Sequence, residues 1–468
     1  MSERLRLAIV GHTNSGKTSL ARTLARNARF GIVDSEPSTT RDAETILLRA
    51  DGLPLAELVD TPGLEDPIRL RDHLHAIATG PRDEGPGLID RFLASPEAAG
   101  RFLPEAIALR ALLEAHAGLY VVDARDEVQP KHRDELYVLR RCRRPLLATI
   151  NFAATEEGRR GAAAWREAFA DAGLDEVAEV DACRFDLEAE QDLYRKLAAK
   201  LDRFRPTLDR LAGDRARRAR DLRRIAARNA LAVAVEASAL AESVPRDDEA
   251  AATAARLRLV ERVRTLERRA ATALLGSFAF PEGDLEPFEV DQINGGFGYD
   301  VLHIDSVKRR DVLAGAGTGA VAGVAAGAAI GAKVEAVTGW IAPGASTTLL
   351  GLGGLVVGGA TPLRRALVRR LRGLREFSLD ESDLATLVHR QLDLARRLLR
   401  RGHASLQPIV APPRDISRSA TPAEREAVRS ALRAIRAKVP PDPDRPTASA
   451  ASHERLIERL SSALANVV

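Results

Sequence analysis

Cysteine, methionine and aromatic residues are all scarce in this chain of 468 residues, which holds two cysteines, one methionine and 4% aromatics. Cys142 and Cys183 form no CxxC pair and have no metal-ligand spacing, which argues against a disulfide framework or a zinc module. A reducing, cytosolic environment is the simplest interpretation of this cysteine usage. Few aromatics beside abundant Ala, Leu and Arg predict a helix-rich protein whose cores are aliphatic.

A strong excess of one charge sign is absent as well. The net charge of +4 is small for this length, so general affinity for nucleic acid does not follow from charge. The apolar h-region of a signal peptide is missing before the first strand, and we expect this end of the chain to stay in the cytoplasm. The length is too great for one ordinary core and predicts about two to four domains.

Residues 11–18, GHTNSGKT, match the phosphate-binding P-loop pattern GxxxxGK[ST]. An apolar run of buried-strand type, Leu5–Val10, precedes the motif and a helical pattern, Thr18–Ala25, follows it. We expect the loop N–H groups to wrap a β-phosphate, with Lys17 between the β- and γ-phosphates as a catalytic group and the Thr18 hydroxyl on Mg²⁺. The alternative is a chance glycine- and serine-rich turn. The predicted nucleotide-binding residues here are Gly11, His12, Thr13, Asn14, Ser15, Gly16, Lys17, Thr18 and Ser19.

A second motif closes the next pair of predicted strands. Apolar patches at 46–48 and 53–59, split by the turn dipeptide Asp51-Gly52, predict a hairpin that ends in the sequence DTPG. A carboxylate at the carboxyl tip of a strand can hold Mg²⁺ through water, and a glycine N–H three residues later can contact the γ-phosphate. Asp60 is therefore a predicted magnesium ligand, and Asp60 and Gly63 are predicted nucleotide contacts.

The polar loop PSTTRD, residues 37–42, lies between the P-loop helix and the hairpin. This order of P-loop, PSTTRD and DTPG resembles the TrmE/Era branch of translation-factor-type GTPases. The resemblance implies that Thr40 is the catalytic switch threonine, which closes over Mg²⁺ and the γ-phosphate. The neighbouring Thr39 is a rival for that role, and a plain turn is the alternative for the whole loop.

The same resemblance bears on the rate of hydrolysis. Leu64 stands where many small GTPases carry a glutamine that orients the attacking water, and a leucine cannot polarise water. Slow intrinsic hydrolysis is therefore implied. In potassium-stimulated members of the branch a P-loop asparagine coordinates K⁺, and Asn14 occupies the matching place. A loop-stabilising side chain is the alternative for Asn14.

The residues expected to contact a nucleotide base are only partly present. Apolar runs at 118–123 and 144–150, separated by a polar helical stretch, predict further strands of a parallel sheet covered on both faces. The second run should end in NKxD, but the sequence is Asn151-Phe-Ala-Ala154, and the loss of the carboxylate weakens discrimination of guanine. Ala182 is the one match to a degenerate SAK loop. Asn151 and Ala182 are thus predicted nucleotide contacts, whereas the base preference stays open.

The C-terminal half begins after Arg205-Pro206. Helices are predicted at 207–242, 248–275 and 380–401, from Thr421 towards Lys438, and from His453. The arginines of the first helix are most simply a solvated face; an anionic lipid surface comes next, and RNA is less favoured because no aromatic residues are interleaved. His403 and the other histidines form no ligand pair and are expected to face solvent.

Two uncharged runs stand out in this half. The run 312–332 carries glycine at every fourth position, which makes a flat stripe suited to close helix contact in lipid. The run 336–363 is also long enough for a hydrocarbon core of roughly 30 Å, and basic residues at both outer ends predict a hairpin with cytoplasmic ends. A soluble Ala/Gly helix pair is the alternative. Era-like motifs with NF in place of NK, followed by such a tail, resemble a bacterial GTPase family whose C-terminal half is known only as a domain of unknown function.

The predicted fold class is α/β, namely a P-loop NTPase domain with a mostly parallel sheet and helices on both faces, followed by a mainly α-helical half with a glycine-zipper hydrophobic hairpin. The predicted domains are an Era-like GTPase domain (1–205), a basic helical region (206–285), a glycine-rich hydrophobic region (286–375) and a C-terminal helical region (376–468).

The predicted function is a GTP- and GDP-binding, slow, Mg²⁺-dependent GTPase switch, with K⁺ as a second ion. We expect it at the cytoplasmic face of the inner membrane, with membrane lipid and a second copy through the glycine stripe as partners. The alternatives are an NTPase with ATP or relaxed base preference, and a cytosolic RNA-associated switch.

Overall fold

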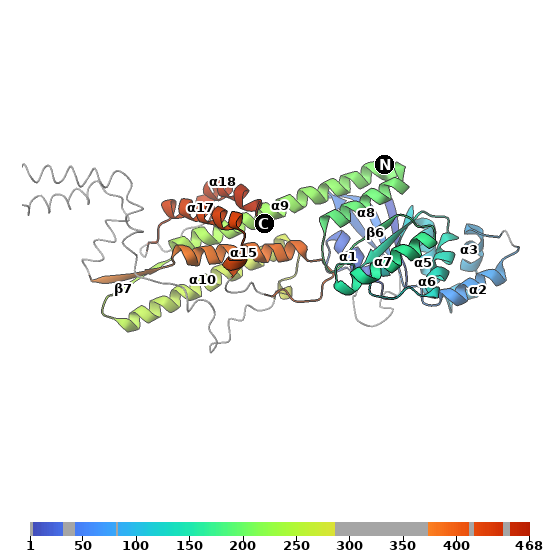
Figure 1. Cartoon of the computed structure of the whole chain (residues 1–468), viewed down its shortest axis with the longest axis horizontal. Helices are drawn as coiled ribbons and strands as arrows, with labels where there is room; N and C mark the ends of the chain where they lie inside the picture. The colour runs from blue at the N-terminus through green and yellow to red at the C-terminus, as the bar shows by residue number, and fades with distance from the viewer. Residues whose placement is uncertain (1–2, 31–42, 81–82, 286–372, 411–415, 443–449) are drawn as a thin grey trace, which may run out of the picture. The chain divides into compact units, whose positions relative to one another are not determined.

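The computed structural model describes residues 3–30, 43–80, 83–285, 373–410, 416–442 and 450–468 (Figure 1). The described residues form two compact units. The described residues of the first unit fall within Met1–Leu222, Leu275–Leu285 and Arg397–Ile409, and those of the second unit within Arg223–Leu274, 373–396 and Val410–Val468. The domain limits expected from the sequence stay predictions.

A six-stranded sheet forms the centre of the first unit, in the order β2-β3-β1-β4-β5-β6. Its strands are β1 (Leu5–Val10), β2 (Glu44–Ala50), β3 (Leu53–Asp60), β4 (Ala117–Asp123), β5 (Leu146–Asn151) and β6 (Val177–Glu179). All neighbours pair in parallel except β2 and β3, which form an antiparallel hairpin. Asp51 and Gly52 both have positive φ at its turn, as a type I′ turn requires.

Helices cover both faces of this sheet because the strand side chains alternate between two cores. Leu5, Leu7 and Ile9 face one core, while Ala8 and Val10 face the other. On the first face lie α1 (Lys17–Ala25), α8 (Leu187–Lys200) and the start of α9 (Arg205–Ala239). On the second face lie α2 (Pro67–Ile77), α3 (Pro86–Leu93), α4 (Pro96–Ala99), α5 (Leu103–Glu114), α6 (Pro130–Arg140) and α7 (Glu156–Asp171). The predicted mostly parallel sheet with helices on both faces is confirmed.

The described part of the C-terminal half is mainly helical. Its helices are the rest of α9, α10 (Glu249–Ser277), α15 (Glu381–Arg400), α16 (Ile416–Ser419), α17 (Pro422–Lys438) and α18 (Glu454–Ala465). The strands β7 (Ala241–Pro245) and β8 (Leu374–Ser378) pair antiparallel. Thr421 caps α17 by accepting a hydrogen bond from the Glu424 N–H, which is the helix start expected from Thr-Pro.

The predicted location at the cytoplasmic face of a membrane is contradicted. In the described part of the chain, no helix is long and apolar enough to cross a membrane. The helices α9 and α10 are long enough but are not apolar enough to span a membrane, because arginine and glutamate recur along them. Such charges are costly in hydrocarbon. The two runs of the predicted glycine-zipper hairpin, 312–332 and 336–363, lie outside the described residues, and membrane association has no support within them.

Candidate functional site

The P-loop joins β1 to α1, and its glycines are required by close backbone approach. Gly11 has φ +146°, and a Cβ there would lie 2.2 Å from the Val121 carbonyl oxygen. Gly16 has φ +83°, and a Cβ there would lie 2.3 Å from the Asn151 amide nitrogen. Only glycine adopts these conformations without strain. The backbone of the loop therefore continues uncovered into the N-terminus of α1. The free backbone N–H groups at a helix N-terminus bind anions.

Lys17 and Asp60 are both buried at this helix N-terminus. The Lys17 ammonium group donates hydrogen bonds to the carbonyl oxygens of His12 (2.7 Å) and Gly11 (3.2 Å). Burial lowers the pKa of Lys17 to about 8, against the attraction of Asp60 and Glu135. Burial also raises the pKa of Asp60 to about 6, against the hydrogen bond from Thr18 and the charge of Lys17.

Two of the three predicted magnesium ligands, Thr18 and Asp60, meet directly. The Thr18 hydroxyl donates a hydrogen bond of 2.5 Å to Asp60 Oδ2. The other oxygen, Asp60 Oδ1, is buried and has no hydrogen-bond partner within the described ranges. A hydroxyl and a carboxylate are oxygen ligands of the kind that Mg²⁺ takes together with substrate phosphates, so this pair fits the ion.

The DTPG loop packs onto the P-loop. The Leu64 N–H donates to the Gly11 carbonyl oxygen (3.1 Å), and a Cβ on Gly63 would lie 2.3 Å from Thr13 Oγ1. Glu105 of α5 fixes the continuation of the loop, because its carboxylate accepts two backbone hydrogen bonds of 2.8 Å, from Glu65 and from Asp66. The Leu64 side chain is 0% exposed and belongs to the hydrophobic core, so it does not face the phosphate site.

Asn151 connects three segments of the first unit by hydrogen bonds of its side chain. Its amide nitrogen donates to the carbonyl oxygens of Ser15 (3.2 Å) and Gly16 (3.3 Å). Its amide oxygen accepts from the N–H groups of Ala182 (2.9 Å) and Phe152 (2.9 Å). One side chain thereby holds the P-loop, the end of β5 and residues 181–185, which we call the base loop.

Two residues near Asn151, Asp181 and Arg125, were given no role by the sequence patterns. Asp181 accepts hydrogen bonds from the N–H groups of Ala154 (3.2 Å), Cys183 (2.9 Å) and Arg184 (3.0 Å). Arg125 places its guanidinium group 4.3 Å from the ring centroid of Phe152, which stands where NKxD has its lysine. The contacts of Asp181 and Arg125 each join two separate loops. In the sequence, the one feature that could have pointed to these residues is that each is a polar residue shortly after a strand.

A segment from far along the chain completes the surroundings of the base loop. The Gly402 N–H donates to the Cys183 carbonyl oxygen (2.9 Å), and the Phe185 N–H donates to the Arg400 carbonyl oxygen (2.9 Å). A Cβ on Gly402 would lie 2.1 Å from the Ala182 carbonyl oxygen. We call residues 400–403 the clamp segment. His403 within it is 8% exposed, so the expectation that it faces solvent is wrong.

The structure brings the predicted residues Gly11 to Thr18 together with Asp60, Gly63, Asn151 and Ala182. Ser19 lies in the first turn of α1, and Asn14 is exposed with φ 64°. Thr40 and its rival Thr39 lie outside the described residues. The roles of all these residues stay predictions.

This fold and this arrangement of P-loop, DxxG loop and Asn151 define a P-loop nucleotide-binding domain. Residues 6–152 match the family described as "50S ribosome-binding GTPase". Residues 166–462, more than half of the chain, match the family described as "Domain of unknown function (DUF3482)". The chain therefore belongs to the DUF3482 family, as the resemblance implied.

Curated relatives match part of the chain. The GTPase Der of Hyphomonas neptunium is 33% identical over 165 residues, which are 35% of this chain and 26% of that protein. The tRNA modification GTPase MnmE of Alkaliphilus oremlandii is 32% identical over 124 residues, which are 26% of each chain. The chain thus spans about a quarter of the length of these relatives. Among solved structures, Aquifex aeolicus Era bound to GDP·AlF4⁻ is 20% identical with a TM-score of 0.27, covering 38% of this chain and 50% of that one.

Proposed function

We propose that the protein binds GTP and GDP through its first unit and hydrolyses GTP slowly with Mg²⁺, as a nucleotide-dependent switch. The observation that carries this proposal is the contact of Thr18 Oγ1 with Asp60 Oδ2 at 2.5 Å beside the buried Lys17. These three residues come from the two motifs that a P-loop NTPase needs for its phosphates and its metal ion.

Lys17 is the group that stabilises phosphate charge in this proposal. Its ammonium group donates hydrogen bonds to two carbonyl oxygens, which are neutral partners. Phosphate oxygens are charged and form stronger hydrogen bonds with an ammonium group, so the β- and γ-phosphates should displace the carbonyls. Thr18 and Asp60 would hold Mg²⁺, which supplies neutralising charge on the phosphate oxygens when bound. Thr40 remains the proposed switch threonine.

Slow hydrolysis is expected because the residue after the DxxG glycine cannot position a water molecule. The side chain after Gly63 is Leu64, which lies in the hydrophobic core and positions no water. The exposed Asn14 at the edge of the P-loop is the proposed K⁺ contact. Replacing Na⁺ by K⁺ should raise turnover, and equal rates in the two salts would remove this part of the proposal.

Weak discrimination between bases is the second candidate property. Ala154 offers no carboxylate, and the N–H groups of Ala154, Ala182 and Cys183 already have partners within the protein. Few groups are left to read guanine, so we expect a smaller preference for GTP over ATP than in proteins with an intact NKxD. Competition of GTP, ATP and ITP for bound fluorescent GDP measures it. RNA and a second copy of the chain stay predictions as partners.

The central test uses the full chain and two substitutions in the site. Lys17→Ala and Thr18→Ala should each lower Mg²⁺-dependent GTP hydrolysis by about a hundredfold or more, the usual effect of removing one group that stabilises transition-state charge. The matched control is Thr253→Ala, which removes an exposed threonine hydroxyl that donates to the Glu249 carbonyl oxygen of its own helix, α10. Wild-type rates in both site variants would refute the proposed hydrolysis.

A further inference from the structure

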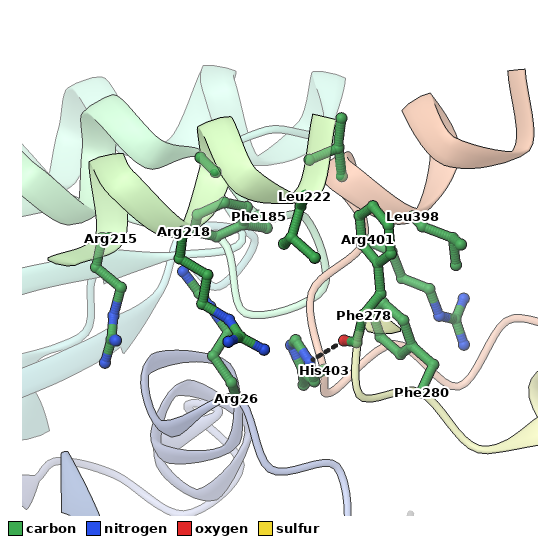
Figure 2. A pocket seen from close by; sticks show the side chains of 12 residues that line it. Arg26, Phe185, Arg215, Arg218, Leu222, Phe278, Phe280, Leu398, Arg401 and His403 are labelled. Carbon is green, nitrogen blue, oxygen red and sulfur yellow. Dashed lines mark hydrogen bonds between the residues drawn. The ribbon is translucent and has the colours of Figure 1, made fainter. Parts of the chain in front are cut away.

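Buried polar side chains also gather at the clamp segment and under the P-loop. At the clamp segment, His403 Nε2 donates a hydrogen bond to the Phe278 carbonyl oxygen (3.2 Å) beside a small cavity (Figure 2). The volume of this cavity is about 30 Å³, room for about one or two water molecules, so it is too small for an organic ligand. The group under the P-loop involves helix α6 and is the more informative of the two.

Glu135 of α6 is a buried acid that ends against the P-loop. Its side chain is 0% exposed, and its Oε2 accepts a hydrogen bond from the Tyr120 hydroxyl of β4 (2.8 Å). Its Oε1 lies 2.9 Å from Nδ1 of the P-loop residue His12. A buried carboxylate is unfavourable unless polar neighbours compensate its charge. Glu135 therefore needs the polar edge of the His12 ring, and it holds the ring on this side.

The other nitrogen of the His12 ring meets a lysine. Lys131, in the first turn of α6, places its ammonium nitrogen 2.9 Å from His12 Nε2. An ammonium group has only donors, so Nε2 accepts this hydrogen bond and the ring proton is on Nδ1, facing Glu135. The ring of His132 meets the His12 ring edge-on, with centroids 6.0 Å apart. Helix α6 thus holds His12 by a cation at one nitrogen and by an anion at the other.

The backbone of His12 takes part in the phosphate site. Its carbonyl oxygen accepts hydrogen bonds from the Lys17 ammonium group (2.7 Å) and from the Ser15 N–H (3.3 Å). His12 also forms a β-bridge with Leu64 of the DTPG loop. In the proposed function, phosphate oxygens replace this carbonyl as the partner of Lys17. The side-chain contacts of His12 with α6 then remain to hold this part of the loop.

We propose that Lys131 is a positioning residue for nucleotide binding, which acts through the His12 ring together with Glu135 at the other ring nitrogen. It fixes the P-loop at the residue that releases Lys17, so that the loop keeps its shape when the phosphates enter. Binding groups that are fixed in advance lose less conformational entropy when the ligand binds, and this raises affinity. The inference rests on the proposed function. The alternative, in which Lys131 attracts the phosphates only as a distant charge, makes no use of His12.

The test measures GDP affinity by calorimetry on the full-length chain. Lys131→Met keeps an unbranched side chain but removes the charge and the donors, and it should weaken GDP by about tenfold, the equivalent of a charge-assisted hydrogen bond. Lys131→Arg, which restores a cation with donors, should recover most of this loss. Arg133→Met is the matched control, because Arg133 is exposed on the same helix and its loss changes the net charge equally. Equal losses in Lys131→Met and Arg133→Met would overturn the proposal.

A double-mutant cycle shows whether the effect passes through His12. His12→Phe keeps an aromatic ring and removes both ring nitrogens, and it should weaken GDP by at least the same factor. In this background Lys131→Met should cause no further loss. A further tenfold loss would mean that Lys131 acts on the phosphates without His12, which overturns the proposal and leaves nucleotide binding intact. Should His12→Phe not fold, the comparison of Lys131→Met with Arg133→Met still decides. A wild-type chain that binds no GDP overturns the proposed function, and this inference with it.

Discussion

The charge of Asp60 should destabilise the nucleotide-free protein, and replacing it by asparagine should reveal by how much. Asp60 is 1% exposed, and burial raises its pKa from an ordinary value of 3.8 to about 6. The folded state therefore binds more protons than the unfolded state between these two values. The free energy of unfolding consequently falls as the pH rises through this window, and the loss is complete above it.

The magnitude follows from the size of the shift. Two pKa units correspond to about 3 kcal/mol between the two protonation states. Asparagine carries no charge and can still accept the hydroxyl hydrogen bond of Thr18, but Lys17 loses the attraction of a carboxylate. We therefore expect Asp60→Asn to raise the free energy of unfolding of the nucleotide-free protein by about 1 to 3 kcal/mol at about pH 8 and by nothing at about pH 4.

The measurement is urea unfolding at both pH values in a Trp340→Phe background. Trp165, which is 1% exposed in α7, is then the one tryptophan and reports on the first unit. Asp186→Asn at the exposed N-cap of α8 is the matched control, because asparagine caps a helix as well as aspartate does. A gain of the same size at both pH values, or a loss at high pH, would refute the reasoning. Mg²⁺ and GDP together should stabilise the wild type and not the variant.

Two further predictions concern the base position. Gly402→Ala should weaken GDP by about tenfold in calorimetry, the equivalent of one lost hydrogen bond, because its Cβ would lie 2.1 Å from the Ala182 carbonyl oxygen. Gly276→Ala, whose Cβ would meet nothing within 4 Å, is the control, and equal GDP affinities in the two variants would contradict the clamp. Asn151→Asp should lower the free energy of urea unfolding by about 1 to 3 kcal/mol, because an oxygen replaces the donor to Ser15. Unchanged unfolding would show that this hydrogen bond is dispensable.

Local patterns predicted the strand and the helix on either side of the P-loop well. Strand, glycine turn and helix follow one another within residues 5–25, and the structure has β1 and α1 at those positions. The Asp51-Gly52 turn forces the hairpin that brings Asp60 back to the P-loop. These features depend on backbone conformation and on neighbours a few residues apart. A single sequence therefore contains the information that specifies them.

The helices of the C-terminal half were also predictable from local patterns. The residues that each helix packs against were not predictable in this way. The pattern at 207–242 became α9, and the pattern at 248–275 became α10, with ends shifted by a few residues. Arg215 shows the limit. In the sequence it is one arginine of a basic run, yet it is 5% exposed and bonds Glu190 at 3.0 Å, while Arg217 and Arg220 on the same helix are exposed. Only the packing of α9 on α8 separates it from them.

The first structural unit crosses the boundary between the two family matches. Besides residues 6–152 it contains segments that belong to the DUF3482 match. Gly402 follows the last turn of α15, where a glycine is expected simply as a helix terminator. The structure shows a second reason for glycine at this position, because any side chain would clash with the backbone of the base loop. Arg215 likewise places the start of α9 against the end of α1, by donating to the Leu24 carbonyl oxygen. Because such contacts belong to the first unit, a truncation before α9 should lose buried partners of the nucleotide domain along with the C-terminal half. Nucleotide binding is therefore fairly measured only in a piece that keeps every segment of the first unit, up to Ile409.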